Sequence, residues 1–162
     1  NIFILPHLTG SGTPWIDPLS KAAIVGITLN SDEGEVIRAI LESIAFELRI
    51  NIELFEEKSV SFQEIRVTGG CARSPFWLQI RADILGKPIR TLAFEDASLL
   101  GAGILAAVGA GYFSRAEEAV QAMVKTKNFL EPDLALHRFY TDRFEVYKEL
   151  YPSLKDINHQ IS

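Results

Sequence analysis

The sequence predicts an α/β fold in which helices cover a sheet that contains parallel strands. Residues 33–54 have the apolar period of a helix, and two short runs rich in β-branched residues, 65–68 and 89–92, are each followed by a capped helix. The order helix, strand, helix, strand, helix implies a parallel pair joined by a right-handed crossover. The 162 residues, 48% hydrophobic and 23% charged, are enough for one domain with a buried core.

The first 29 residues predict only short extended pieces. Residues 2–5 form one extended run, 9–14 a loop by composition, and 22–29 a strand or an extended segment. The chain opens directly on strand-like residues and does not begin with methionine. Because two secure strands make a thin sheet, we expect further strands upstream of residue 1 and read the domain as truncated at its N-terminus.

The clearest helix prediction covers residues 33–54. Three alternative N-caps precede it at residues 30–32, and Glu33 and Glu35 place carboxylates in the first turn, where the helix dipole favours them. One broad apolar face then repeats every three or four residues. Its members are Val36, Ile37, Ile40, Leu41, Ile44, Ala45 and Leu48.

The later helices are predicted from their ends. Ser74 is a cap for a helix that ends before Gly86, where a left-handed residue is wanted, and Asp96 is a cap for a helix over residues 98–108. A second kind of start, a capping box, is predicted at residues 114–117 for a short helix to residue 124. The last helix carries an aromatic face, and Pro152 is its predicted stop. That face holds Leu136, Tyr140, Phe144, Tyr147 and Tyr151.

The best candidate for a binding site is the turn at residues 67–74, where a strand ends and a helix begins. Two glycines, Gly69 and Gly70, allow a sharp turn and a close approach to the main chain. Free amides at a helix start, with the dipole behind them, bind anions, and Arg73 adds a charge or a surface that stacks on adenine. On the local pattern alone, a plain strand–helix turn without a ligand is the commoner interpretation.

Other motifs are explained better by structure than by chemistry. No G-x-x-x-x-G-K-[ST] string exists, so a P-loop is not predicted. Residues 101–106 fit G-x-G-x-x-A but lie in a helix-like segment, where small residues indicate close packing; a nicotinamide-dependent oxidoreductase rests on this string alone. The three histidines are scattered, so no metal site is predicted. Cys71 is read as a lone packed thiol.

The charge and the single cysteine limit the surroundings of the protein. The formal net charge is −5, which argues against nucleic acid or an anionic membrane as the main partner. A single cysteine excludes an internal disulfide and fits a reducing compartment. We therefore expect a cytoplasmic protein.

Three stretches together resemble the FGGY family of carbohydrate kinases. The first runs from residue 3 to 18 and ends in Trp15-Ile16-Asp17-Pro18, similar to the proline-rich entry of the family. The second, residues 22–42, fits the longer family signature without a gap. The third, residues 69–88, resembles the nucleotide segment of the family, with Cys71 at the position of its usual third glycine, and 101–111 resembles the small-residue helix that follows.

This resemblance implies a fold, a ligand and a reaction. The fold is the ribonuclease-H-like α/β fold of the sugar kinase, Hsp70 and actin superfamily, and the chain, residues 1–162, is its C-terminal ATP-binding domain. The nucleotide-binding residues that it implies are Gly69, Gly70, Cys71, Arg73 and Ser74, with the glycine turn near the phosphates and with Arg73 and Ser74 near ribose or adenine. The implied partners are ATP with Mg²⁺, whose ligands are not in this chain, and a sugar or polyol substrate of the full-length protein.

The resemblance also implies what the chain does not supply. In the family, the sugar domain and the catalytic aspartate precede the segment at which this chain begins, so we expect it to have no kinase activity alone and assign no catalytic residue. An ATP-binding regulator of the same superfamily, without a sugar, is the alternative function. With strands missing, the sheet should expose an edge, which favours association between copies.

Overall fold

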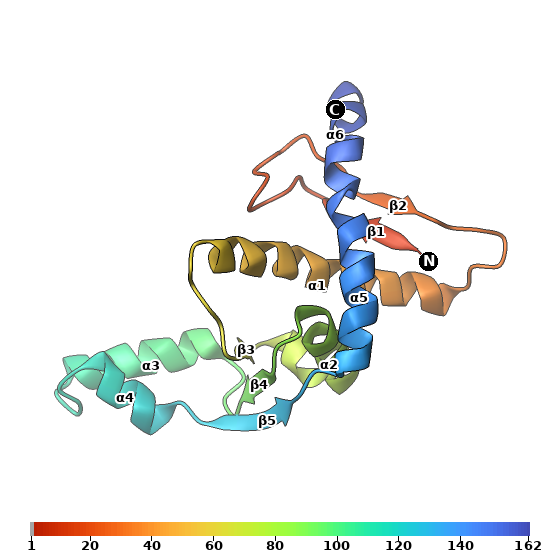
Figure 1. The fold of residues 1–162 in the computed structure, drawn as a ribbon. Coiled ribbons are helices and arrows are strands. Elements are labelled where there is room, and N and C mark those ends of the chain that lie inside the picture. Colours follow the sequence, from red (N-terminus) through yellow and green to blue (C-terminus); the bar gives the residue numbers. More distant parts are fainter. Residues whose placement is uncertain (1) are drawn as a thin grey trace.

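The computed structural model describes residues 2–162, which form two small sheets and six α-helices (Figure 1). The long helix α1 (Glu33–Glu57) runs through the middle of the molecule. The first sheet and the C-terminal helix lie on one side of it, and the second sheet lies on the other. Over the described residues, no helix is both long and apolar enough to cross a membrane.

The first sheet is an antiparallel pair. Strand β1 (Phe3–Leu5) pairs with β2 (Ala23–Val25), and Phe3 lies opposite Val25. Both strands fall within the segments that the sequence predicts as extended. The loop between them, residues 6–22, crosses to the C-terminal helix (Figure 1).

Helix α1 begins as predicted and extends three residues beyond the predicted end. Its N-cap is Asp32, and a capping box joins Asp32 to Glu35: the Glu35 amide donates to Asp32 at 2.8 Å, and the Asp32 amide donates to Glu35 at 3.2 Å. The predicted face is confirmed in part, since its members Ala45 and Leu41 lie in or against the core. Ala45, Phe46 and Ile50 lie in the core, whereas the predicted members Ile37, Ile40 and Ile44 remain exposed.

The second sheet contains the predicted parallel pair and one strand that was not predicted. Strand β3 (Ile65–Val67) runs parallel to β4 (Ile89–Leu92), and α2 (Pro75–Leu85) connects them. Strand β5 (Thr126–Leu130) pairs antiparallel with the other edge of β4. Its sequence, Thr-Lys-Asn-Phe-Leu, is mostly exposed and lacks an alternating pattern, so nothing local marks it as a strand.

The caps of α2 are those that the sequence predicts. The Ser74 hydroxyl accepts from the Trp77 amide at 3.3 Å, and Gly86 ends the helix with a φ of 62°. A side chain at Gly86 would also collide with the His137 ring, since a Cβ there would lie 2.5 Å from its Cε1 atom. Two properties of glycine therefore suit this position: it adopts a positive φ without strain, and it has no Cβ to meet His137.

Helices α3 (Ala97–Gly109) and α4 (Ala116–Met123) form a hairpin at one end of the molecule (Figure 1). Asp96 caps α3 as predicted, accepting from the Leu99 amide at 2.9 Å. The dinucleotide-like string, residues 101–106, lies inside α3 and does not follow a strand. The predicted capping box of α4 is wrong: Arg115 is the N-cap and gives no side-chain bond, while Glu118 accepts from the Ser114 amide at 3.1 Å.

Two helices end the chain where one was predicted. Helix α5 (Leu134–Lys148) is followed by α6 (Leu150–Gln160), and Pro152 lies in the first turn of α6 instead of stopping a helix. Proline is tolerated there because the first turn of a helix does not use the amide that proline lacks.

The main core joins α1, α2 and α5. The predicted aromatic face of α5 supplies three of its buried rings, and Phe46 of α1 packs against them. Its buried members are Ala45, Phe46, Ile50, Ile80, Ile84, Tyr140, Phe144 and Tyr147.

Candidate functional site

The predicted glycine turn opens onto a groove of about 330 Å³. The groove lies where β3 and β4 end and where α3 begins, so it is at the carboxyl ends of two neighbouring parallel strands. This edge is where ligands bind in open α/β sheets. The residues that line the groove are Thr68, Gly69, Gly70, Arg73, Glu95, Asp96, Ala97 and Ser98.

The two glycines leave the wall of the groove bare. Gly69 has a φ of 78°, a conformation that L side chains rarely adopt, and its amide donates to the Glu95 carbonyl at 3.1 Å. A Cβ placed on Gly69 or Gly70 would meet no atom within 4 Å. The space beside both residues is thus open, and their main chain is accessible to a ligand.

Three of the five predicted binding residues line this groove, and two do not. Gly69, Gly70 and Arg73 line it. Cys71 lies in the short 3₁₀ helix η1 (Gly70–Arg73), donates its thiol to the Thr68 carbonyl at 3.4 Å and packs against a buried cluster that includes Val67 and Leu78. The Ser74 hydroxyl is occupied by the cap of α2.

The charged side chains of the groove include one ion pair that the sequence does not predict. Arg73 donates to Glu95 from Nε at 3.0 Å and from an Nη at 2.6 Å, although the two residues are 22 positions apart. Both side chains are exposed, by 71% and 53%. The remaining carboxylate, Asp96, caps α3 with one oxygen. No local signal pairs Arg73 with Glu95, because the parallel strand order alone brings them together.

The side chains of the lining are mostly small, polar or carboxylate groups. Among its eight residues there is no histidine, lysine or cysteine that could act as a base or a nucleophile. It instead offers bare backbone, one guanidinium, two carboxylates and small side chains at the start of α3. Such a set can hold a polar small molecule through hydrogen bonds and stacking.

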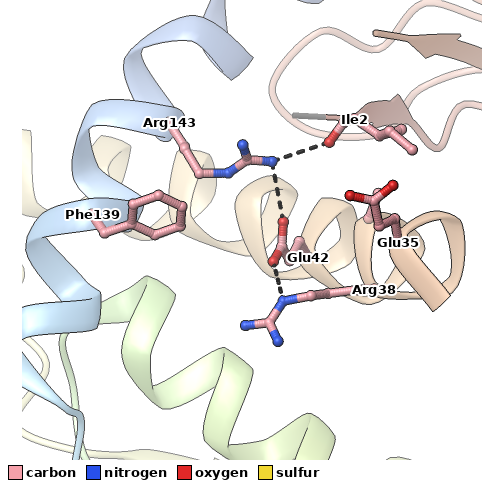
Figure 2. A pocket seen from close by; sticks show the side chains of 7 residues that line it. Ile2, Glu35, Arg38, Glu42, Phe139 and Arg143 are labelled. Atoms are coloured by element: carbon pink, nitrogen blue, oxygen red, sulfur yellow. Dashed lines mark hydrogen bonds and ion pairs between the residues drawn. The ribbon is translucent and has the colours of Figure 1, made fainter. Parts of the chain in front are cut away.

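A second cavity, of about 310 Å³, lies between α1 and α5 (Figure 2). Its floor is Glu42, which is almost fully buried and accepts from Arg38 at 2.9 Å, from Tyr140 at 2.9 Å and from Arg143 at 3.3 Å. Arg143 also donates to the Ile2 carbonyl at 3.0 Å. The Glu42 carboxylate is thus shared by three side chains, and the network links Ile2, next to β1, to α1 and α5. Among the described residues, the buried Nε of Arg143 has no hydrogen-bond partner.

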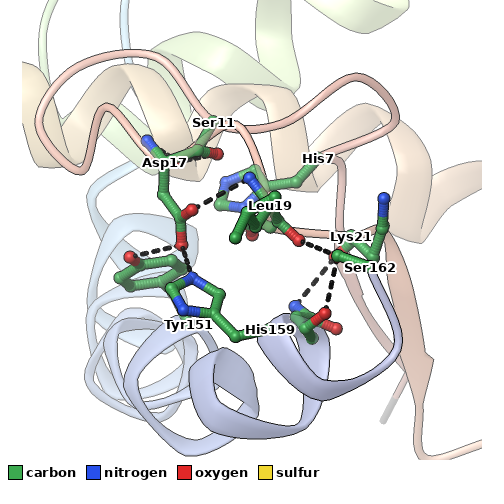
Figure 3. Close-up of polar contacts among 10 residues, drawn as sticks. His7, Ser11, Asp17, Leu19, Lys21, Tyr151, His159 and Ser162 are labelled. Atoms are coloured by element: carbon green, nitrogen blue, oxygen red, sulfur yellow. Dashed lines mark hydrogen bonds and ion pairs between the residues drawn. The ribbon is translucent and has the colours of Figure 1, made fainter.

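A third polar cluster ties the loop between β1 and β2 to α6 (Figure 3). Asp17 is buried and accepts from Tyr151 at 2.9 Å and lies 2.7 Å from His159 Nε2. The hydrogen bond from His159 and that from Tyr151 lower the pKa of the Asp17 carboxyl from 3.8 to about 2, against the opposing effect of burial. Asp17 therefore anchors the loop between β1 and β2 to α6.

Comparison with known proteins places the chain among sugar kinases. Residues 1–110 match the family described as "FGGY family of carbohydrate kinases, C-terminal domain". The xylulose kinase of Staphylococcus epidermidis is 32% identical over 156 residues, which are 96% of this chain and 32% of that protein. The xylulose kinase of Bacillus subtilis is 33% identical over 94% of this chain and 31% of its own length.

The fold agrees with solved structures of the same kind. A ligand-bound xylulose kinase from Lactobacillus acidophilus has a TM-score of 0.91 at 26% identity, over 100% of this chain and 33% of that chain. A gluconate kinase from the same organism has a TM-score of 0.86 at 26% identity, over 99% and 32%. The chain thus spans about a third of the length of the relatives that it matches.

Proposed function

Because the chain belongs to the FGGY family of carbohydrate kinases, with the ribonuclease-H-like fold of that superfamily, we propose that it supplies the nucleotide-binding part of an ATP-dependent kinase. The reaction is the transfer of the ATP γ-phosphate to a hydroxyl of a sugar or polyol. Relatives named for xylulose, glycerol and gluconate match the chain, so the class of acceptor is a polyhydroxylated carbon chain and not one named sugar.

One observation carries the assignment to this part of the chain. The Gly69–Gly70 turn opens onto a groove at the carboxyl ends of β3 and β4, and no atom lies within 4 Å of where either side chain would start. Paired glycines that only made a turn would not need this open space on the same side. Gly69, Gly70 and Arg73 are the proposed contacts, and Cys71 and Ser74 hold the turn in place from behind.

The chain is proposed to bind nucleotide without transferring its phosphate. Phosphoryl transfer needs a positioned acceptor and a base beside it, and we assign neither role to a residue of the groove. Magnesium would accompany the ATP phosphates. We assign it no ligand in the groove, where one oxygen of Glu95 accepts from Arg73 and one oxygen of Asp96 caps α3. We propose the cytoplasm as the place of action.

The test is nucleotide binding by the purified chain, measured by calorimetry with ADP. Gly70→Leu fills the open wall and should weaken binding by about tenfold or more, because the side chain takes the space of the ligand. Gly109→Leu is the matched control, since Gly109 also has open space around it but lies at the far end of α3. Equal ADP affinity in both variants and in the unaltered chain would disprove the site.

The alternative, an ATP-binding regulator, predicts the same binding and a different protein context. A full-length protein that binds ATP at Gly70 but phosphorylates no member of a panel of ketoses and polyols would favour the regulator. Turnover of any member, lost in the Gly70→Leu variant, would favour the kinase.

A further inference from the structure

The groove at the glycine turn has the wrong charge balance for a triphosphate. Its lining carries two carboxylates, Glu95 and Asp96, against the single guanidinium of Arg73. Phosphate oxygens placed there would be repelled by like charges at short range. The neutral end of a nucleotide, its base and ribose, meets no such penalty, and a volume of about 330 Å³ is at the small end of the range for ligand sites.

Glu95 lines this groove, and its main chain is held against the glycine turn. Its carbonyl accepts from the Gly69 amide at 3.1 Å, which fixes the loop between β4 and α3 against the glycine turn. Both hydrogen bonds from Arg73 end on the same carboxylate oxygen, Oε2. In the part of the chain that the structure describes, no hydrogen bond occupies Oε1.

The Arg73–Glu95 ion pair of the groove can be exchanged for contacts to a ligand at little cost in stability. Arg73 and Glu95 are 71% and 53% exposed, and exposed pairs of this kind contribute little to stability. A ligand that hydrogen-bonds Glu95 and stacks on the guanidinium of Arg73 therefore gains more than it displaces.

We propose that Glu95 is the residue that recognises ribose in the bound nucleotide. Its carboxylate accepts from the two neighbouring ribose hydroxyls, since two acceptor oxygens match two adjacent donors. Arg73 turns from Glu95 to the face of the base, and the phosphates leave the groove past Gly69 and Gly70. This inference rests on the proposed function and adds the residue that selects ribonucleotides.

The experiment compares ADP with 2′,3′-dideoxy-ADP, which has the same base and phosphates but neither hydroxyl. Calorimetry on the purified chain should show ADP binding about tenfold more tightly, because hydrogen bonds to a charged group are lost in the dideoxy compound. The Glu95→Ala variant should bind both compounds with the same affinity. Glu95→Gln, which keeps one acceptor oxygen, should retain part of the preference.

A matched control separates recognition from a general loss of charge. Glu57→Ala removes an exposed carboxylate at the end of α1, away from the groove, and should leave the tenfold preference unchanged. A thermal melt of each variant reports whether it folds.

The outcomes separate two claims: that the groove binds nucleotide, and that Glu95 recognises its ribose. If the chain binds ADP and Glu95→Ala keeps the preference for ADP, Glu95 does not read ribose, and the proposed function stands. If neither compound binds the unaltered chain, the nucleotide site itself is wrong, and this inference falls with it.

Discussion

The clamp around Glu42 and the groove around Glu95 use the same chemical groups in opposite ways. In the clamp, a buried glutamate is shared by two arginines and a tyrosine, and the partners come from α1 and α5 (Figure 2). In the groove, a glutamate and an arginine form one exposed pair beside bare glycine backbone. The first arrangement buries its glutamate among three donors, and the second, within the described part of the chain, leaves one carboxylate oxygen of Glu95 without a hydrogen bond beside open space at the glycines.

The buried network and the exposed pair differ in what it costs to break them. Burial makes an ion network costly to break, because a charge left alone in a poorly hydrated place loses its solvation. An exposed ion pair separates at a small cost in free energy, because water solvates both partners when they part. A ligand site needs the second property, and a joint between helices needs the first.

The largest effect that separates the two regions is expected from the aromatic core beside the clamp. Phe46 is fully buried, with its ring centre 4.9 Å from that of Tyr147 and 5.9 Å from that of Phe144. Phe46→Ala should lower the free energy of unfolding by about 3–5 kcal/mol through the cavity that it creates. Urea denaturation measures this.

The control for Phe46 is the exposed Phe76, in the first turn of α2. Phe76→Ala should change the free energy of unfolding by less than about 0.5 kcal/mol. Similar losses in both variants would contradict the view that burial decides how much an aromatic side chain contributes to stability.

The next effect compares the two glutamates directly. Glu42→Ala leaves Arg143 buried without its carboxylate and should cost about 2–4 kcal/mol, with half-exposed Arg38 moderating the loss. Glu95→Ala should cost at most about 1 kcal/mol. Urea denaturation of the pair gives the comparison, and an equal cost would show that burial is not what distinguishes the two networks.

The smallest effect is the pH dependence set by Asp17, which contacts Tyr151 and His159 (Figure 3). Its native pKa of about 2 lies below the ordinary 3.8, so its charged form stabilises the fold above about pH 4. That stabilisation is lost as the pH falls from about 4 toward 2. Asp17→Asn should therefore show a shallower loss of stability over this interval than the unaltered chain.

Exposed Asp142 provides the control for this pH profile. Asp142→Asn should follow the unaltered chain over the whole interval, in urea denaturation at successive pH values. A parallel shift of Asp17→Asn, without any change in slope, would show that the His159 and Tyr151 contacts do not act through the charge of Asp17.

Much of the fold could be predicted because its signals are local. Asp32, Ser74 and Asp96 cap helices with bonds to amides three residues away, and Gly86 ends α2 because only glycine tolerates its backbone there. The parallel pair β3 and β4 followed from the order of the elements. Strand β5 could not be predicted, since β4 and not its own pattern makes it a strand.

Prediction from local sequence failed where the same residue is compatible with two different structures. Pro152 is compatible with a helix end and with a first helical turn, and only the packing of Tyr151 against Trp15 and Asp17 shows which one occurs. The predicted α1 face was only partly right, because Ala45 and Leu41 meet the core but other members do not. Ile40 and Ile44 are apolar by sequence, but the core formed on the side of Phe46.

By itself, the sequence determined the family, the helix caps and the glycine turn, since each depends on residues within a few positions or on a fixed string of them. The tertiary structure alone decided which groups meet: Arg73 with Glu95, Glu42 with Arg143, and Asp17 with His159. These partners lie between 22 and 142 positions apart. No local rule reaches that far, because such pairs form only after the strand order and helix packing have fixed the distance between them.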